Sequence, residues 1–205
     1  MKSTGRGRKI DDGGIRELIL AAAMEALRED GVHGLSQVHI ARRAKVRQSH
    51  LTYYFPKRHD LIEAMATRFV DGIAHGVDPA AATGSADDAL RSLLRHLAAV
   101  VVDRGHMRMF TAMIVEADGD PKVRAILVRV TLRLQSMLAA RLGGDDPDQR
   151  AGTIIANLWG LGLYDFLLRP KRPGERVASY IAGVTNVTAP RKRASVTRHA
   201  IRKGR

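Results

Sequence analysis

The sequence predicts an all-α protein, and three observations support that prediction. Apolar residues recur at helical spacing along most of the 205 residues, as on one face of a helix. Glycine and proline divide these stretches into helix-sized segments. Alternating β-branched runs, which would indicate strands, never extend beyond a few residues. We therefore expect about nine helices and no sheet.

The first two expected helices lie close to the start of the chain. The first begins near Ile15 and ends at Gly31. The second begins after Ser36, a good N-cap residue because its hydroxyl accepts from a free backbone N–H of the first turn. Its expected apolar positions are Val38, Ile40, Ala41 and Ala44. The rest of its surface is polar.

A tight basic turn at residues 45–47 joins the second helix to a third over residues 48–54. Val46 is the only apolar residue of the turn, and we expect it to insert into the core and fix the interhelix angle. Leu51 and Phe55, four residues apart, form the buried side. The outward side chains are Arg47, Gln48, Ser49, His50, Thr52, Tyr53 and Tyr54.

Such polar side chains on the second helix of a pair are typical of a helix-turn-helix that reads DNA in the major groove. The alternative is a small helical hairpin with an ordinary solvated face. A solvated face does not need two adjacent exposed tyrosines, so the DNA-reading interpretation is favoured.

The remaining helices follow in order, each bounded by turn-forming residues. The fourth is expected from His59 to Gly76, before a loop at residues 77–86 that is rich in small residues. The others are expected over residues 87–103, 106–117, 121–142, 147–168 and 175–187. Gly152, Gly160 and Gly162 in the helix over 147–168 each cost about 1 kcal/mol unless another backbone approaches closely.

The net charge of +13 is confined to the two ends of the chain. Residues 1–59 contribute +6 and residues 189–205 contribute +7, whereas residues 60–188 are neutral. A basic charge restricted to the helix-turn-helix and a tail indicates a polyanionic partner, above all DNA. A membrane surface is the rival, but neither basic segment has a bulky apolar face to insert.

Four elements between Ile15 and Phe69 also follow a known pattern. They are Ile40-Ala41-Arg42-Arg43-Ala44, Val46 in the turn, Leu51 with Tyr53-Tyr54-Phe55, and Arg58-His59-Asp60-Leu61. In these residues the chain resembles the DNA-binding domain of TetR-family transcriptional regulators. It departs from the family at Lys45, where Gly is usual, and at Thr52, where Tyr is usual. A lysine at positive φ would cost on the order of 1 kcal/mol against Gly.

The resemblance implies double-stranded operator DNA as a partner and a particular division of the chain. It implies a basic flexible arm at residues 1–14, a helix-turn-helix domain at 15–58, a ligand-binding and dimerisation domain at 59–188, and a basic disordered tail at 189–205. Residues 59–76 would form the connecting helix. The expected DNA-binding residues are Ser36, Gln37, Arg47, Gln48, Ser49, His50, Tyr53, Tyr54, Lys57 and Arg58.

The resemblance further implies a homodimeric repressor that an unknown small-molecule effector releases from a palindromic operator. The last two long helices would form the dimer interface, although both could instead fill the core of one chain. Two-fold symmetry would place the two helix-turn-helix domains of the dimer about one DNA turn, or a multiple of one turn, apart. We expect the connecting helix, with Met65 and Phe69 between the domains, to transmit movement from one domain to the other.

Methionine and aromatic residues in the expected helices over 106–117 and 147–168 suit the lining of a pocket for an apolar or mixed ligand. Ordinary core packing is the alternative for each of them. The expected ligand-binding residues are Met107, Phe110, Met113, Asn157, Trp159 and Tyr164.

Other classes of function lack their motifs in this sequence. There is no cysteine, no Gly-rich phosphate loop, no Gly-x-Ser-x-Gly elbow and no histidine pair with metal-ligand spacing. We expect no enzyme activity, catalytic residue, cofactor, metal or membrane association, and a cytoplasmic location in a bacterium. The alternative function is a ligand-independent architectural DNA-binding protein, which the long neutral segment disfavours.

Overall fold

The computed structural model describes residues 12–76 and 85–188, and every regular element within these ranges is helical. Most of the basic arm, most of the loop at 77–86 and the whole tail fall outside the described residues. The elements are α1 (Asp12–Asp30), a 3-10 helix η1 (Gly31–Leu35), α2 (Gln37–Arg43), α3 (Gln48–Tyr54), α4 (Arg58–Gly76), α6 (Ala86–Val102), α7 (Arg104–Gly119), α8 (Pro121–Leu142), α9 (Pro147–Leu168) and α10 (Glu175–Thr188).

This element order confirms the all-α prediction, and several boundaries agree with it to the residue. Helices α3 and α9 cover the predicted ranges, and α8 begins at Pro121 after Asp120, whose side chain accepts from the backbone N–H of Lys122 at 2.8 Å. The 3-10 helix was not predicted. Val38 was predicted to be apolar core, but it is 64% exposed, so this prediction was wrong.

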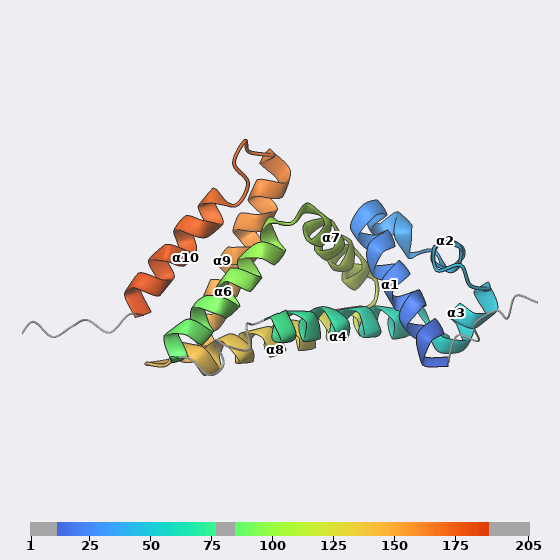
Figure 1. The fold of residues 1–205 in the computed structure, drawn as a ribbon, viewed down its shortest axis with the longest axis horizontal. Helices are drawn as coiled ribbons and strands as arrows, with labels where there is room; N and C mark the ends of the chain where they lie inside the picture. Colours follow the sequence, from blue (N-terminus) through green and yellow to red (C-terminus); the bar gives the residue numbers. More distant parts are fainter. Residues whose placement is uncertain (1–11, 77–84, 189–205) are drawn as a thin grey trace, which may run out of the picture.

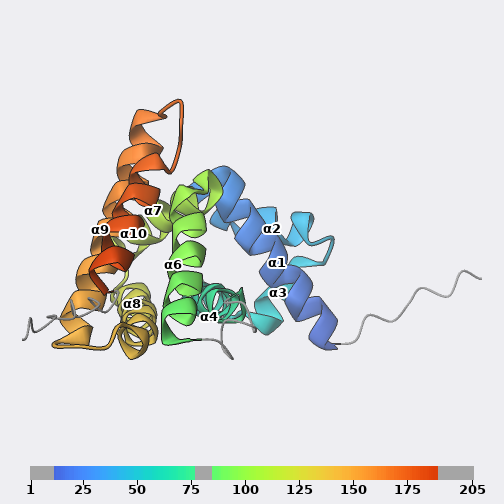
Figure 2. The same ribbon diagram turned by 60° about the vertical axis from the view of Figure 1, so that its left-hand side comes forward.

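The helices form a small N-terminal head and a larger helical body, which lie at opposite ends of the molecule (Figure 1). Helices α1, α2 and α3 make the head, and α4 leaves it to run alongside α8. Arg133 of α8 pairs with Asp71 of α4 at 2.9 Å. Helices α9 and α10 lie on the side away from the head in both ribbon views (Figure 2).

Two hydrophobic cores support this arrangement. The first joins the head to α7 and the start of α8, since Ile40, Leu51 and Ile62 belong to the same buried cluster as Met113 and Val123. The second lies among α4, α6, α8, α9 and α10. The core of the head therefore continues past the predicted domain boundary after residue 58 and includes side chains of the body.

Gly162 allows α9 to pack closely against α6. A Cβ atom at this position would lie 2.7 Å from the carbonyl oxygen of Val101, closer than real Cβ contacts allow. Of the three glycines in α9, this one has the close backbone approach that offsets its low helix propensity. A Cβ atom at Gly152 would contact only the side chain of Gln135 in α8, and a Cβ atom at Gly160 would meet nothing within 4 Å.

Helix α9 is also the one described helix that is long and apolar enough, by length and composition, to cross a membrane. Helices in protein cores and interfaces can meet the same test. In the stretch that meets the test, 33% is buried within this chain, and Ile154, Ile155 and Leu158 of α9 belong to the second core.

We predict that Gly162→Ala destabilises the fold by about 1–3 kcal/mol, because the added methyl group overpacks the contact with α6. Gly72→Ala is the matched control, since Gly72 lies inside α4 with nothing within 4 Å of an added Cβ. This control should be stabilised by up to about 1 kcal/mol. Thermal unfolding followed by circular dichroism measures both. Equal effects in the two variants would contradict the proposed close approach.

Candidate functional site

The pair of helices α2 and α3 is built as the sequence predicts. The Ser36 hydroxyl accepts from the backbone N–H of His39 at 3.2 Å, which confirms Ser36 as the N-cap of α2. In the turn, the N–H of Val46 donates to the carbonyl oxygen of Ala41 at 3.0 Å. The Val46 side chain packs against the first core and holds the two helices at a fixed angle.

Lys45 occupies the turn with φ of +54°, in the left-handed region that favours glycine. The turn therefore does require a positive φ at the position where Lys replaces the more usual Gly. The lysine side chain is exposed, so its charge extends into solvent beside α3.

Helix α3 presents one buried and one exposed side. Leu51 and Phe55 are 1% and 2% exposed and anchor the helix on the first core. Among the outward residues, Tyr53 is 74% exposed. Tyr54 is partly buried against the first core, and its ring meets that of Tyr53 edge to face, with centroids 5.0 Å apart.

Nine of the ten predicted DNA-binding residues are exposed, and Tyr54 is the exception. The exposed residues are Ser36, Gln37, Arg47, Gln48, Ser49, His50, Tyr53, Lys57 and Arg58. The Gln48 amide donates to the Gln37 amide oxygen at 3.4 Å, which links the first turns of the two helices. Thr52, where the family usually has Tyr, donates its hydroxyl to the carbonyl oxygen of Gln48.

Arg58 has partners that sequence reasoning missed. Its Nε and Nη2 atoms donate to the two carboxylate oxygens of Glu116 in α7 at 2.8 and 2.7 Å, and its Nη1 donates to the carbonyl oxygen of Leu35. In this structure Arg58 therefore links the head to α7 and is not a free side chain on the reading surface. A bidentate arginine–carboxylate pair is among the stronger and more directional ion pairs.

Two further arginines link α7 to the end of α1. Arg108 of α7 donates to the carbonyl oxygens of Arg28 and Glu29, the last turn of α1, where the carbonyls lack helical partners. Arg28 donates in the other direction, to Oδ1 of Asp103 at 3.1 Å. The position of α7 is thus tied to the position of the head by polar contacts as well as by the shared core.

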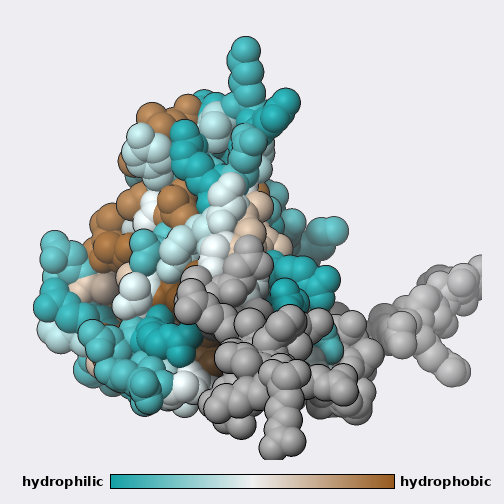
Figure 3. All heavy atoms as spheres, turned by 90° about the vertical axis from the view of Figure 1, so that its left-hand side faces the viewer, coloured by the Kyte–Doolittle hydropathy of each residue, from teal (hydrophilic) through white to brown (hydrophobic). Residues whose placement is uncertain are grey.

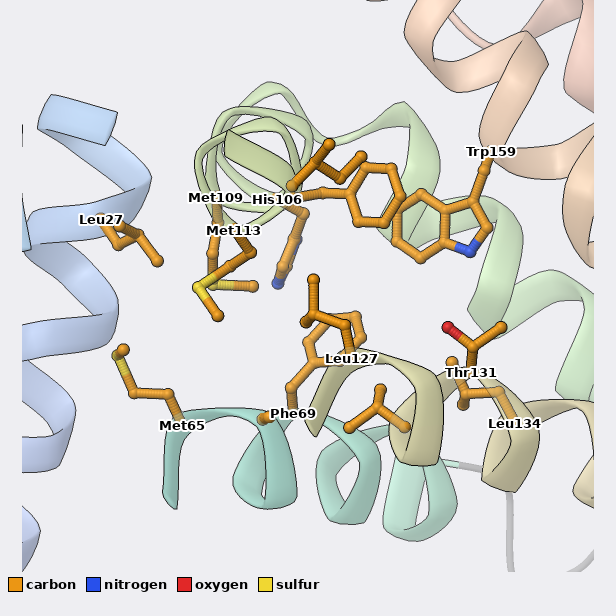
Figure 4. Close-up of a pocket in the computed structure, with 14 residues that line it drawn as sticks. Leu27, Met65, Phe69, His106, Met109, Met113, Leu127, Thr131, Leu134 and Trp159 are labelled. Carbon is orange, nitrogen blue, oxygen red and sulfur yellow. The ribbon is translucent and has the colours of Figure 1, made fainter. Parts of the chain in front are cut away.

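A cavity of about 240 Å³ lies directly behind these contacts (Figure 4). Five helices contribute to its wall: α1, α4, α7, α8 and α9. Its lining is almost wholly apolar and includes Met65 and Phe69 of the connecting helix. The rings of Phe110 and Trp159 stack in the wall with centroids 4.0 Å apart and planes 14° from parallel.

The structure brings together half of the predicted ligand-binding residues. Phe110, Met113 and Trp159 line the cavity. Met107 is buried in the second core and does not line it. Asn157 and Tyr164 are exposed and do not line it.

His106 is a polar residue of the cavity wall that sequence reasoning missed. Its side chain lines the cavity, and its Nδ1 atom lies 2.9 Å from Oδ1 of Asp103, although not in line for a straight hydrogen bond. The same carboxylate caps α7 by accepting from the backbone N–H of His106 at 2.7 Å. The Asp-x-x-His spacing at a helix start was the available sequence signal.

The charges around His106 favour its neutral form. Burial lowers the pKa of His106, and the positive charge of Arg28 lowers it further, against the opposing effect of Asp103. Burial acts to raise the pKa of Asp103, but the hydrogen bond from the His106 backbone and the nearby positive charges outweigh it and lower that pKa. At neutral pH the pair is therefore an aspartate anion and a neutral imidazole.

The fold and the helix-turn-helix define a class of protein, the helix-turn-helix transcriptional regulators with a helical C-terminal domain. The comparisons with known proteins then identify the family. Residues 19–65 match the bacterial regulatory proteins of the tetR family, and residues 87–183 match the tetracyclin repressor-like C-terminal domain. The chain belongs to the TetR family, whose members are transcriptional regulators and not enzymes.

Individual relatives agree with this assignment. An uncharacterised HTH-type transcriptional regulator of Mycobacterium tuberculosis strain H37Rv is 32% identical over 145 residues, which is 67% of this chain. The chain spans 62% of the length of that relative. A TetR-family regulator from Rhodococcus sp. has the same fold, with a TM-score of 0.73 and 23% identity over 85% of this chain and 97% of that one.

A second solved structure is a transcriptional regulator from Saccharomonospora viridis in complex with choline. It superposes with a TM-score of 0.70 and is 17% identical, covering 83% of this chain and 95% of its own. At this low sequence identity, the similarity between the two structures shows only that they share a fold.

We predict that Lys45→Gly stabilises the protein by about 1 kcal/mol, because glycine adopts the left-handed backbone of the turn without the steric cost of a side chain. Lys45→Ala is the control: it removes the charge but keeps a Cβ atom, and it should leave the stability nearly unchanged. Chemical denaturation measures both free energies. Equal stabilisation by Gly and Ala would mean that charge repulsion, and not backbone strain, is relieved.

Proposed function

We propose that this chain is a homodimeric transcriptional repressor that binds a palindromic operator and is released from it by a small-molecule effector. One observation carries the proposal. The cavity is bordered by α1 of the head and by α4 and α7, which both pack against α1. A ligand that changes the spacing of these helices changes the position of α3.

The proposed DNA contacts come from the exposed side of α2 and α3. Gln37 and Gln48 lie at the helix starts, where side chains reach base edges. His50 and Tyr53 project from α3 opposite its buried anchors, and Arg47 and Lys57 flank them with positive charge. Because amide and imidazole groups read bases whereas cations bind phosphate, this arrangement combines specificity with attraction.

Ser36 and Arg58 have roles of a different kind in the proposal. The Ser36 hydroxyl already accepts the N-cap bond of α2, so we assign it to fixing the helix start beside the phosphate backbone. Arg58 is held by Glu116, and it reaches DNA only if that ion pair opens. We therefore assign Arg58 to the coupling between head and body.

The proposed dimer interface is the outer surface of α9 and α10. Leu163, Tyr164, Leu167 and Leu168 are apolar or aromatic, and they are between 37% and 68% exposed on the last turns of α9. Apolar residues gather on the surface at this end of the molecule (Figure 3). Burying such a patch against a second copy removes it from water.

An ion pair with a buried carboxylate joins α9 to α10. Asp165 is 6% exposed and accepts from Nη1 of Arg176 at 2.6 Å and from the backbone N–H of Gly174 at 3.0 Å. These contacts fix the start of α10 against the end of α9. A four-helix interface needs both helices at a defined separation.

The coupling proposal follows from the contacts of α7. A ligand in the cavity touches Met113 on one side of α7, while Glu116, one turn further along, holds Arg58. A ligand lowers operator affinity only to the extent that it favours one position of the heads over another. The ligand-independent architectural alternative offers no role for a cavity between the head and a neutral body.

We predict that His50→Ala and Tyr53→Ala each lower operator affinity about 10- to 100-fold, because each loses a base contact worth about 1–3 kcal/mol. The operator is obtained by selection from random DNA, and affinity is measured by fluorescence anisotropy. His75→Ala, an exposed histidine near the end of α4, is the control and should bind as wild type. Wild-type affinity in both α3 variants would refute α3 as the reading helix.

We predict that the double variant Leu163→Arg, Leu167→Arg is monomeric, because two like charges would meet their symmetry mates in the interface. Both residues are exposed in the single chain, so the monomer should still fold. Light scattering coupled to size exclusion gives the mass. Val128→Arg, at an equally exposed apolar position on α8, should remain dimeric. An unchanged mass in the double variant would place the interface elsewhere.

A further inference from the structure

The wall of the cavity carries no formal charge. None of the residues that line it is Asp, Glu, Lys or Arg, and the polar groups among them are the imidazole of His106, the hydroxyl of Thr131 and the indole N–H of Trp159. A charged ligand would lose its hydration in this cavity without gaining an ionic partner, which costs several kcal/mol or more. The wall therefore selects for neutral ligands.

The size and shape of the cavity favour a flat ring system. An apolar cavity of about 150 Å³ holds one benzene molecule, so a volume of about 240 Å³ accommodates one substituted ring or two fused rings. The stacked rings of Phe110 and Trp159 are 14° from parallel and form one flat section of the wall. Because their facing surfaces cover each other, they do not make an open cage around a cation.

His106 gives the cavity a directional polar group next to a carboxylate. Its Nδ1 side is turned to the Asp103 carboxylate at 2.9 Å, and the tip of the ring, Nε2, points into the cavity between Met113 and Leu127 (Figure 4). A lone pair on Nδ1 would be repelled by the nearby carboxylate, so the neutral ring carries its proton on Nδ1 and keeps its lone pair on Nε2. The group presented to a ligand is then a hydrogen-bond acceptor.

We infer that the cavity binds a neutral, planar, largely apolar molecule of one or two rings whose single hydroxyl or N–H group donates to Nε2 of His106. This inference rests on the proposed function for its regulatory meaning, but not for the binding itself. Asp103 is a positioning residue, since it orients the ring without touching the ligand.

The same carboxylate connects the ligand contact to the head. Oδ1 of Asp103 lies 2.9 Å from Nδ1 of His106 and 3.1 Å from Nη2 of Arg28 at the end of α1. A ligand that pulls on the His106 ring therefore acts on the carboxylate that holds Arg28. His106, which recognises the ligand, and Arg28, which belongs to the head, therefore contact the same carboxylate oxygen.

Isothermal titration calorimetry with four probes tests the ligand class on the full-length protein. 2-Naphthol has the ring and the donor, naphthalene has the ring alone, 2-naphthoate adds a negative charge, and choline is a cation. We expect 2-naphthol to bind about tenfold more tightly than naphthalene, as one net hydrogen bond allows. Neither 2-naphthoate nor choline should bind measurably.

Two substitutions then locate the acceptor. In His106→Leu the preference for 2-naphthol over naphthalene should disappear while naphthalene still binds, which shows that the cavity is intact. In His106→Gln the side-chain amide oxygen restores an acceptor, and part of the preference should return. The matched control His75→Leu removes an exposed histidine outside the cavity and should keep the full preference.

Several outcomes would overturn the inference. These are equal affinity for 2-naphthol and naphthalene in the wild type, tighter binding of 2-naphthoate or choline, or an unchanged preference in His106→Leu. Operator binding, measured separately with and without 2-naphthol, tests the proposed function. Donor-dependent binding with unchanged operator affinity would refute the regulation alone, whereas operator release by a ligand indifferent to His106 would refute the ligand class alone.

Discussion

Helix α7 contributes side chains to both hydrophobic cores, and this double burial constrains the rest of the structure. Met109 and Met113 belong to the core of the head, whereas Met107 lies in the core of the body. Closely packed interiors do not deform continuously. A displacement of α7 therefore requires both cores to repack, and the polar contacts of Arg58 and Arg108 carry the same displacement to the head. The cavity lies against α7, one of the elements that the two parts of the protein share.

Most of the fold could be predicted because its helix ends are encoded locally. Ser36 caps α2, and Pro121 and Pro147 open α8 and α9, so the boundaries depend on neighbouring residues that the sequence displays. The 3-10 helix at Gly31–Leu35 is too short to show a periodic pattern. Val38 was placed in the core from its residue type alone, but only seven residues form α2, and its buried positions are Ile40 and Ala41.

The two sites differ in how far sequence reasoning could reach them. The reading surface comes from adjacent residues on two short helices, so local patterns sufficed. The cavity draws on five helices, and the rotation of each one decides which side chains face it. Each residue turns the helix by about 100°, which places Asn157 and Tyr164 about 160° and 140° away from Trp159. Likewise Arg58 appeared to be a DNA contact because Glu116, its partner, is distant in sequence.

The stacked pair of Phe110 and Trp159 also has an optical consequence. Trp159 is the single tryptophan of the chain, and its indole forms part of the cavity wall. The indole emission of the native protein therefore originates at one place, where α9 borders the cavity. The wavelength and intensity of this emission depend on the polarity and contacts of the cavity wall. Tryptophan fluorescence therefore reports on the state of the cavity without any added label.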